Sequence, residues 1–64
     1  MNEIYFNTNR SCWIEKSEAG YRAGNAGCSQ SKSVFKTPEE AGNNVGLTAE
    51  EVIDCMNADP EIEE

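Results

Sequence analysis

The sequence predicts an α+β fold in which a small antiparallel sheet of three to four strands is followed by two short C-terminal helices on one face. Three observations predict it. The first third of the chain carries short runs of aromatic and β-branched residues. Two helix start signals follow, at Thr37 and Thr48. A chain of 64 residues is long enough for one domain with a thin core. We expect residues 1–58 to form that domain and residues 59–64 to be an acidic flexible tail.

Three strands are predicted in the first third of the chain, over residues 3–7, 11–16 and 21–23. Short polar segments separate them and favour tight turns, so the three strands are predicted to form an antiparallel meander. In the second strand, side-chain alternation places Cys12 and Ile14 on one face of the sheet and Trp13 on the other. With a simple register between the first two strands, Tyr5 lies on the same side as Trp13.

A polar, glycine-containing loop follows over residues 24–33. Its composition is compatible with a bulge or with a short irregular strand that ends at Val34 and Phe35.

Both helices are predicted from their start signals. Thr37 is a typical N-cap, and it is followed by proline at the first helical position and by Glu39 and Glu40 in the first turn. This helix is short because Gly46 is a stop signal and Gly42 weakens its middle.

The second helix begins with a capping box formed by Thr48 and Glu51. Leu47, before the cap, can pack on Val52 as a hydrophobic staple. Apolar residues then recur at the spacing of a buried helical face, and Pro60 predicts an end near Asn57.

Charge divides the chain into two unequal parts. The net charge is −7, but residues 1–36 carry three acids and five bases, whereas residues 37–64 carry nine acids and no base. Phosphate contacts require Lys and Arg, so the acidic half argues against direct binding of nucleic acid. It favours a basic partner, including proteins that themselves bind nucleic acid.

Side chains for catalysis or metal binding are poorly represented. The chain contains no histidine, so a Ser-His or Cys-His pair is excluded and the usual general base is missing. Cys12, Cys28 and Cys55 lack the close spacing of zinc ligands, and the acids around Asp54 lack the pattern of a calcium loop. We therefore expect no enzyme, no metal and no cofactor. Reduced cysteines are favoured, and a bridge from Cys12 to Cys28 stays open for an oxidising setting.

The candidate partner-binding residues are Glu50, Glu51 and Asp54 on the second helix, together with Trp13 and Tyr5 on the sheet. The three acids fall at i, i+3 and i+4 spacing with no base at helical reach, where like charges repel weakly. They form either a solvated face that keeps the protein soluble or a docking surface for a basic groove. Trp13 is either a core residue or an exposed aromatic anchor.

No apolar run approaches the length of a membrane span, and strand-like residues follow Met1 directly where a signal peptide would lie. A cytoplasmic protein with no membrane partner is therefore expected.

Several segments resemble the core of HicB-type antitoxins. They are the strand that ends at Glu15, the Gly20-Tyr21 turn into the next strand, the Gly27-Cys28 element and the T-x-E-E-A-x-x-N helix start at residues 37–44. The resemblance covers about half of the chain. It implies a β-β-β-α layout and a compact module that blocks a basic nucleic-acid-handling protein.

Size, acidity and the lack of catalytic groups together predict an interaction protein. The function that we expect first is a phage or mobile-element inhibitor of host defence, of the anti-CRISPR or anti-restriction type, which binds a basic nucleic-acid-handling protein or complex. The alternative is a HicB-like antitoxin or regulatory module that neutralises a cognate toxin.

Overall fold

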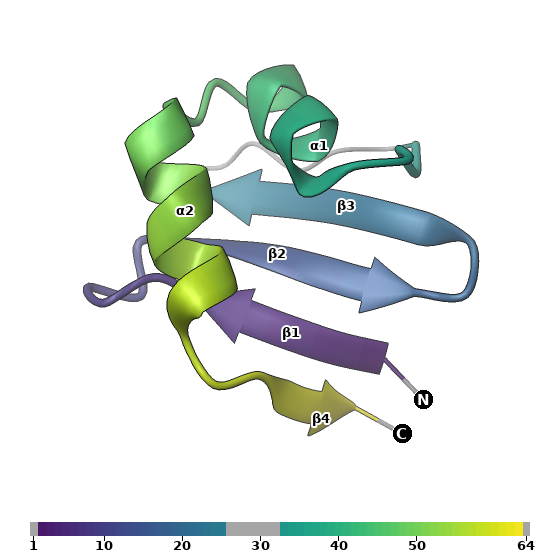
Figure 1. Ribbon diagram of the computed structural model, residues 1–64, viewed down its shortest axis with the longest axis horizontal. Coiled ribbons are helices and arrows are strands. Elements are labelled where there is room, and N and C mark those ends of the chain that lie inside the picture. Colours follow the sequence, from purple (N-terminus) through teal and green to yellow (C-terminus); the bar gives the residue numbers. More distant parts are fainter. Residues whose placement is uncertain (1, 26–32, 64) are drawn as a thin grey trace.

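The computed structural model describes residues 2–25 and 33–63, and it confirms the predicted α+β class. Four antiparallel strands form one sheet in the order β3-β2-β1-β4, and both helices cover the same face of it (Figure 1). The elements are β1 (Asn2–Phe6), β2 (Cys12–Ser17), β3 (Gly20–Asn25), α1 (Pro38–Asn44), α2 (Ala49–Asn57) and β4 (Glu61–Glu63).

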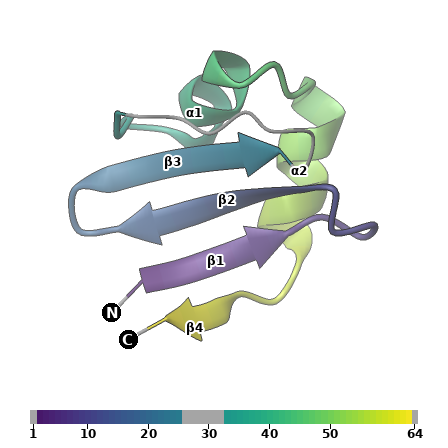
Figure 2. The same cartoon turned by 180° about the vertical axis from the view of Figure 1, so that it is seen from behind.

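Strand register decides which side chains face the helices. Tyr5 pairs with Ile14, and Ile14 pairs with Ala23, so these three residues share the helix-covered face. Phe6 pairs with Trp13 on the opposite face, which no helix covers and which we call the open face (Figure 2). The sheet therefore separates a buried side from a side that is only partly shielded.

The core lies between the sheet and the helices, where Ile14 is fully buried. Tyr5 and Tyr21 from the strands, with Phe35 and Met56, pack around its margin. The remaining buried core side chains are small or medium-sized, as the sequence predicts for a thin core: Cys12, Ala23, Ala41, Val45, Leu47, Val52 and Cys55.

Both helices begin where the sequence predicts. The Thr37 hydroxyl accepts a hydrogen bond from the backbone N–H of Glu40 at 3.2 Å. At α2 the capping box is complete, because the Thr48 hydroxyl accepts from the Glu51 N–H while the Glu51 carboxylate accepts from the Thr48 N–H. Helix α2 ends at Asn57, which confirms the predicted end.

The junction of α1 and α2 depends on two glycines. Gly46 has φ +82°, a left-handed conformation that suits glycine at a helix end. At Gly42, an added Cβ would lie 2.5 Å from Cγ2 of Val52, so this position lets the two helices approach. The same residue that weakens α1 in isolation is thus required where the helices pack together.

The segment before α1 adds one residue to the sheet edge. Phe35 forms an isolated bridge with Tyr21, with both backbone hydrogen bonds at 2.8 Å. Residues 26–32 of the predicted loop lie outside the described part of the chain, and so does Cys28.

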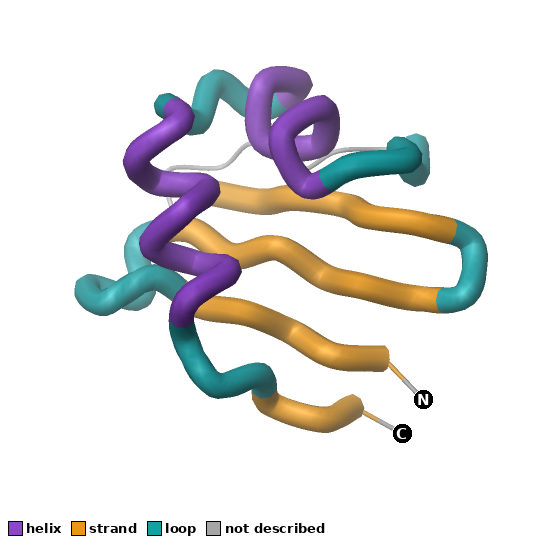
Figure 3. The backbone as a smooth tube through the Cα atoms, viewed as in Figure 1, coloured by secondary structure: helices purple, strands orange, loops and turns teal. Residues whose placement is uncertain are grey.

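The expected flexible tail at residues 59–64 is wrong for residues 61–63. These residues form β4, which pairs antiparallel with β1 through Glu3–Ile62 and Ile4–Glu61 (Figure 3). The physical reason is that β1 would otherwise be an edge strand with unpaired backbone groups, and the chain leaving α2 supplies their partners.

None of the described helices is long and apolar enough to cross a membrane.

Candidate functional site

The three acidic residues singled out on the second helix lie around one polar hollow. We call Glu50, Glu51 and Asp54, all on α2, the acidic rim. The hollow has a volume of about 390 Å³ and is open to solvent. Its other described lining residues come from the β1–β2 turn and from the cap of α2: Asn7, Asn9, Ser11 and Thr48.

Asp54 joins the acidic rim to the turn. One carboxylate oxygen accepts a hydrogen bond from the backbone N–H of Thr8 at 3.0 Å, and the other accepts from the Thr8 hydroxyl at 3.0 Å. Helix α2 is therefore fixed to a turn that lies 46 residues earlier in the chain. Sequence reasoning predicted Asp54 as a rim acid but missed Thr8, because no local pattern links residues so far apart.

Glu51 and Glu50 differ in what they do for the fold. Glu51 closes the capping box, with its Oε1 atom 2.9 Å from the Thr48 nitrogen. Glu50 is exposed, and no hydrogen bond or ion pair involves its side chain within the described residues. The acidic rim is thus partly a structural feature, and within the described residues Glu50 is the member whose carboxylate makes no hydrogen bond; its charge lies in the first turn of α2, where the helix dipole favours it weakly.

A buried asparagine shapes the turn beside the rim. The Asn7 Oδ1 atom accepts from the backbone N–H groups of Ser11 and Cys12 at 2.7 and 3.2 Å, and its amide nitrogen donates to the Ser11 hydroxyl at 2.9 Å. Arg10 adopts φ +54° within the same turn. These bonds satisfy the buried Asn7 side chain and set the position from which Thr8 reaches Asp54.

The prediction that Tyr5 and Trp13 share a face of the sheet is wrong. Tyr5 pairs with Ile14 on the helix-covered side, whereas Trp13 pairs with Phe6 on the open face. The physical reason is that side chains alternate along a strand, so a shift of one residue in the register moves Tyr5 to the other face. The two aromatic residues therefore do not form one surface.

Tyr5 is a margin residue of the core. It is partly buried, and its hydroxyl donates a hydrogen bond to a Glu3 carboxylate oxygen at 3.2 Å. Burial, with smaller contributions from this hydrogen bond and from the Glu3 charge, raises the pKa of the Tyr5 hydroxyl.

Trp13 lies on the open face with its indole against the backbone of β3. A Cβ at Gly24 would overlap Cζ2 of Trp13, so glycine leaves room for the ring in the position that it occupies. Trp13 is half-buried. It is therefore neither a core residue nor a freely exposed anchor.

Arg10 covers another part of the open face. Its guanidinium carbon lies 4.0 Å from the centroid of the Phe6 ring, and Nη1 is 2.7 Å from a carboxylate oxygen of Glu61 on β4. Both charged side chains are more than half exposed. A base from the first half of the chain is thus neutralised by an acid of the predicted tail, a pairing that the charge count alone could not show.

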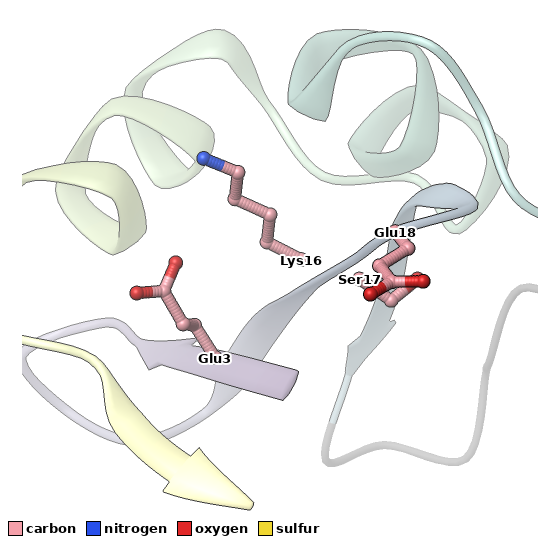
Figure 4. A pocket seen from close by; sticks show the side chains of 4 residues that line it. All are labelled: Glu3, Lys16, Ser17 and Glu18. Carbon is pink, nitrogen blue, oxygen red and sulfur yellow. The ribbon is translucent and has the colours of Figure 1, made fainter. Parts of the chain in front are cut away.

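A second hollow, of about 300 Å³, opens at the hairpin end of the sheet. Figure 4 shows Glu3 and Lys16 projecting from neighbouring strands, with Ser17 at the end of β2 and Glu18 in the β2–β3 turn. These side chains carry both signs of charge, so the hollow offers no concentrated field to a charged ligand.

Two of the three cysteines come together in the core. The sulfur atoms of Cys12 on β2 and Cys55 on α2 are 3.7 Å apart, and both cysteines are free. Burial, the largest cause, raises the pKa of both thiols and brings that of Cys55 to about 12. The described residues contain no group of three or more potential metal ligands. The bridge from Cys12 to Cys28 left open by the sequence involves a residue outside the described part.

A scan against protein-family models, a search of curated proteins and a search of solved structures each found no match for this chain.

Proposed function

We propose that this chain is a non-enzymatic, acidic interaction protein that binds and inhibits a basic nucleic-acid-handling protein or complex. The proposal places it in the cytoplasm, as a phage or mobile-element inhibitor of host defence, of the anti-CRISPR or anti-restriction type. The observation that carries the proposal is that both helices carry acidic residues and no base.

The helix layer is uniformly acidic. Helices α1 and α2 contain no Lys or Arg, and their five acids comprise the acidic rim together with Glu39 and Glu40. The bases in the described residues lie elsewhere: Arg10 in a turn, Lys16 and Arg22 on strands and Lys36 before α1. A basic partner that docks on α1 and α2 therefore meets helices whose charged side chains are all acidic, which speeds encounter and favours one orientation.

The acidic rim is suited to docking because part of it is already ordered. Glu51 and Asp54 are held by Thr48 and Thr8, so fewer rotamers are lost when a partner binds. A carboxylate can accept about four hydrogen bonds, so both groups keep free acceptor positions for a Lys or Arg side chain. Glu50 adds a charge that no hydrogen bond within the described residues engages.

Inhibition follows because this chain and the nucleic acid compete for the same Lys and Arg side chains of the partner. Proteins that bind nucleic acid do so largely through Lys and Arg contacts to phosphate. An acidic surface that occupies those side chains displaces the nucleic acid, without any chemistry on either partner.

The second candidate is a HicB-like antitoxin or regulatory module with a cognate toxin. The order β1, β2, β3, α1 is the layout that the resemblance implies, and this observation supports the candidate. The two candidates share the acidic docking surface and differ in the identity of the partner.

The test is capture of the partner with immobilised protein from cells of the source, followed by a nucleic-acid displacement assay with the captured protein. We expect a basic protein that releases its nucleic acid when this chain is added. Glu50→Gln should weaken capture several-fold, mainly through a slower on-rate, and the binding of this variant should depend less on salt.

Arg22→Gln is the matched control, because Arg22 is an exposed base on a strand. This change should leave capture within twofold of the unmodified protein. A partner that keeps its nucleic acid, or capture that only Arg22→Gln weakens, would contradict the proposal.

A further inference from the structure

We propose that Cys12 and Cys55 are a reversible redox pair, which a small disulfide oxidant converts into a covalent link between β2 and α2. The geometry points to it. The two sulfur atoms are 3.7 Å apart across the interface of the sheet and the helix layer. An S–S bond is about 2.05 Å long, so the sulfur atoms have to approach by less than about 2 Å.

The backbone on either side of the pair is held in place. Cys12 begins β2, and its N–H group donates to Asn7 while its carbonyl accepts from the Asn7 N–H at 3.2 Å. Cys55 follows Asp54, whose carboxylate holds Thr8 in the same turn. These hydrogen bonds therefore hold the β1–β2 turn and α2 on either side of the two sulfur atoms. A disulfide would link two segments whose relative position the fold already fixes.

Both thiols are buried in the folded protein and have almost no contact with solvent. Cys12 is 1% exposed and Cys55 is 0% exposed. A thiolate is the reactive form of cysteine, and buried thiols in apolar surroundings stay protonated. Reaction with an oxidant therefore requires α2 to separate transiently from the sheet, so the pair responds slowly and reports sustained oxidising conditions.

The reaction is an ordinary thiol–disulfide exchange. One cysteine thiolate attacks the oxidant RSSR, forms a mixed disulfide and releases RS⁻, which takes up the proton that the thiol lost. The second cysteine attacks the protein sulfur of the mixed disulfide and releases the other RS⁻, which is protonated in the same way. In total, two thiols lose two electrons and one RSSR is reduced to two RSH.

The disulfide would hold α2 covalently against β2. The link joins residues 43 positions apart and encloses β3 and α1. Closing a loop of this length lowers the conformational entropy of the unfolded chain, and this stabilises the folded state relative to the unfolded state. The link also fixes α2, which carries the acidic rim. The inference concerns the core alone and does not depend on the proposed docking function.

The test uses the unmodified protein, which is incubated in its native state with oxidised glutathione, then unfolded in denaturant that contains an alkylating agent, and digested with trypsin. Cleavage after Lys and Arg puts each cysteine on its own peptide, at residues 11–16, 23–32 and 37–64. We expect the peptide at 11–16 linked to that at 37–64. The melting temperature should rise by about 10 °C or more, and dithiothreitol should reverse the rise.

Three results would overturn the proposal: alkylation of Cys12 and Cys55 after prolonged incubation, a link from 11–16 to 23–32, or an oxidised protein that melts no higher than the reduced one. Cys28→Ser gives a background in which only the proposed pair can bridge. The change Cys28→Ser should leave both the link and the thermal shift intact, and loss of either in a folded Cys28→Ser protein would also count against the pair.

Discussion

The helix layer and the open face of the sheet differ in how their charges are used. On the open face, Arg10 stacks on Phe6 and pairs with Glu61, so opposite charges neutralise each other. Helices α1 and α2 contain no base, and two of their five acids, Asp54 and Glu51, are held by the neutral donors Thr8 and Thr48. Neutral donors hold a carboxylate in place without cancelling its charge. The Arg10–Glu61 pair is thus neutralised within the sheet side of the fold, whereas the acids of the helices keep their negative charge.

The helix layer and the open face also differ in packing. A substitution that disturbs the packing of the helices should give the largest loss of stability. At Gly42 an added Cβ would meet a buried Val52 methyl group, whereas at Gly24 it would meet the half-exposed ring of Trp13. Gly42→Ala should destabilise the fold by about 1.5 kcal/mol, because the clash outweighs the gain in helix propensity. The melting temperature should fall by about 10 °C.

Gly24→Ala is the matched change on the open face. The Trp13 ring can lift toward water there, so the loss measured by thermal unfolding should be smaller than at Gly42. A Gly42→Ala protein that melts at or above the original temperature would show that the helices do not pack as described.

The N-cap of α2 gives the next effect. The Thr48 hydroxyl accepts from the Glu51 N–H, and Thr48→Ala removes that acceptor. We expect a loss of about 1 kcal/mol, seen as a melting temperature lower by about 5 °C. Thr48→Ser keeps the hydroxyl and should recover most of the loss; if Ser and Ala behave alike, the cap contributes nothing.

Alkaline pH should destabilise the fold through the buried thiol of Cys55 on α2. The pKa of Cys55 is raised to about 12 from 9.0, first by burial, then by Cys12 and by the nearby carboxylates of Asp54 and Glu51. The folded state therefore holds its proton where the unfolded state releases it. The stability from this group is complete below pH 9 and is lost as the pH rises toward 12.

Melting temperatures of the reduced protein at pH 8 and pH 11 check this effect. The decrease should be larger in the unmodified protein than in Cys55→Ala, because the variant lacks the Cys55 thiol. Tyr5, whose pKa is also raised, is present in both proteins, so its contribution cancels in the comparison. Equal decreases would assign the alkaline effect to groups other than Cys55.

The smallest effect is expected on the open face. Arg10→Gln removes an exposed ion pair and a cation–π contact, which together contribute about 0.5 to 1 kcal/mol. Added salt should reduce the difference in melting temperature between this variant and the unmodified protein. A loss above about 2 kcal/mol would mean that β4 depends on this pair for its place in the sheet.

Local signals carried most of the fold prediction. The caps at Thr37 and Thr48 act within four residues, so the sequence alone locates both helix starts. Side-chain alternation likewise separates Trp13 from Cys12 and Ile14. The sheet class and the position of the helices on one face follow from these signals and from the size of the chain.

Long-range pairings account for what the sequence could not predict. The register that places Tyr5 opposite Ile14 is set by the turn after β1, and β4 is too short and too acidic to be recognised as a strand. The Asp54–Thr8 and Cys12–Cys55 contacts join residues 46 and 43 positions apart. The sequence therefore predicted the capping role of Glu51, but it could not predict the inequality of Asp54 and Glu50, because Asp54 bonds to Thr8, 46 residues earlier in the chain.

That inequality is the central claim, and paired thermal unfolding of Asp54→Asn and Glu50→Gln tests it most directly. Asp54→Asn leaves one acceptor for two Thr8 donors, so we expect a loss of about 1 kcal/mol and a melting temperature lower by about 5 °C. Glu50→Gln should stay within about 0.5 kcal/mol of the unmodified protein. Equal melting temperatures for the two variants, or a larger loss at Glu50, would contradict the claim that the fold uses Asp54 and leaves Glu50 free.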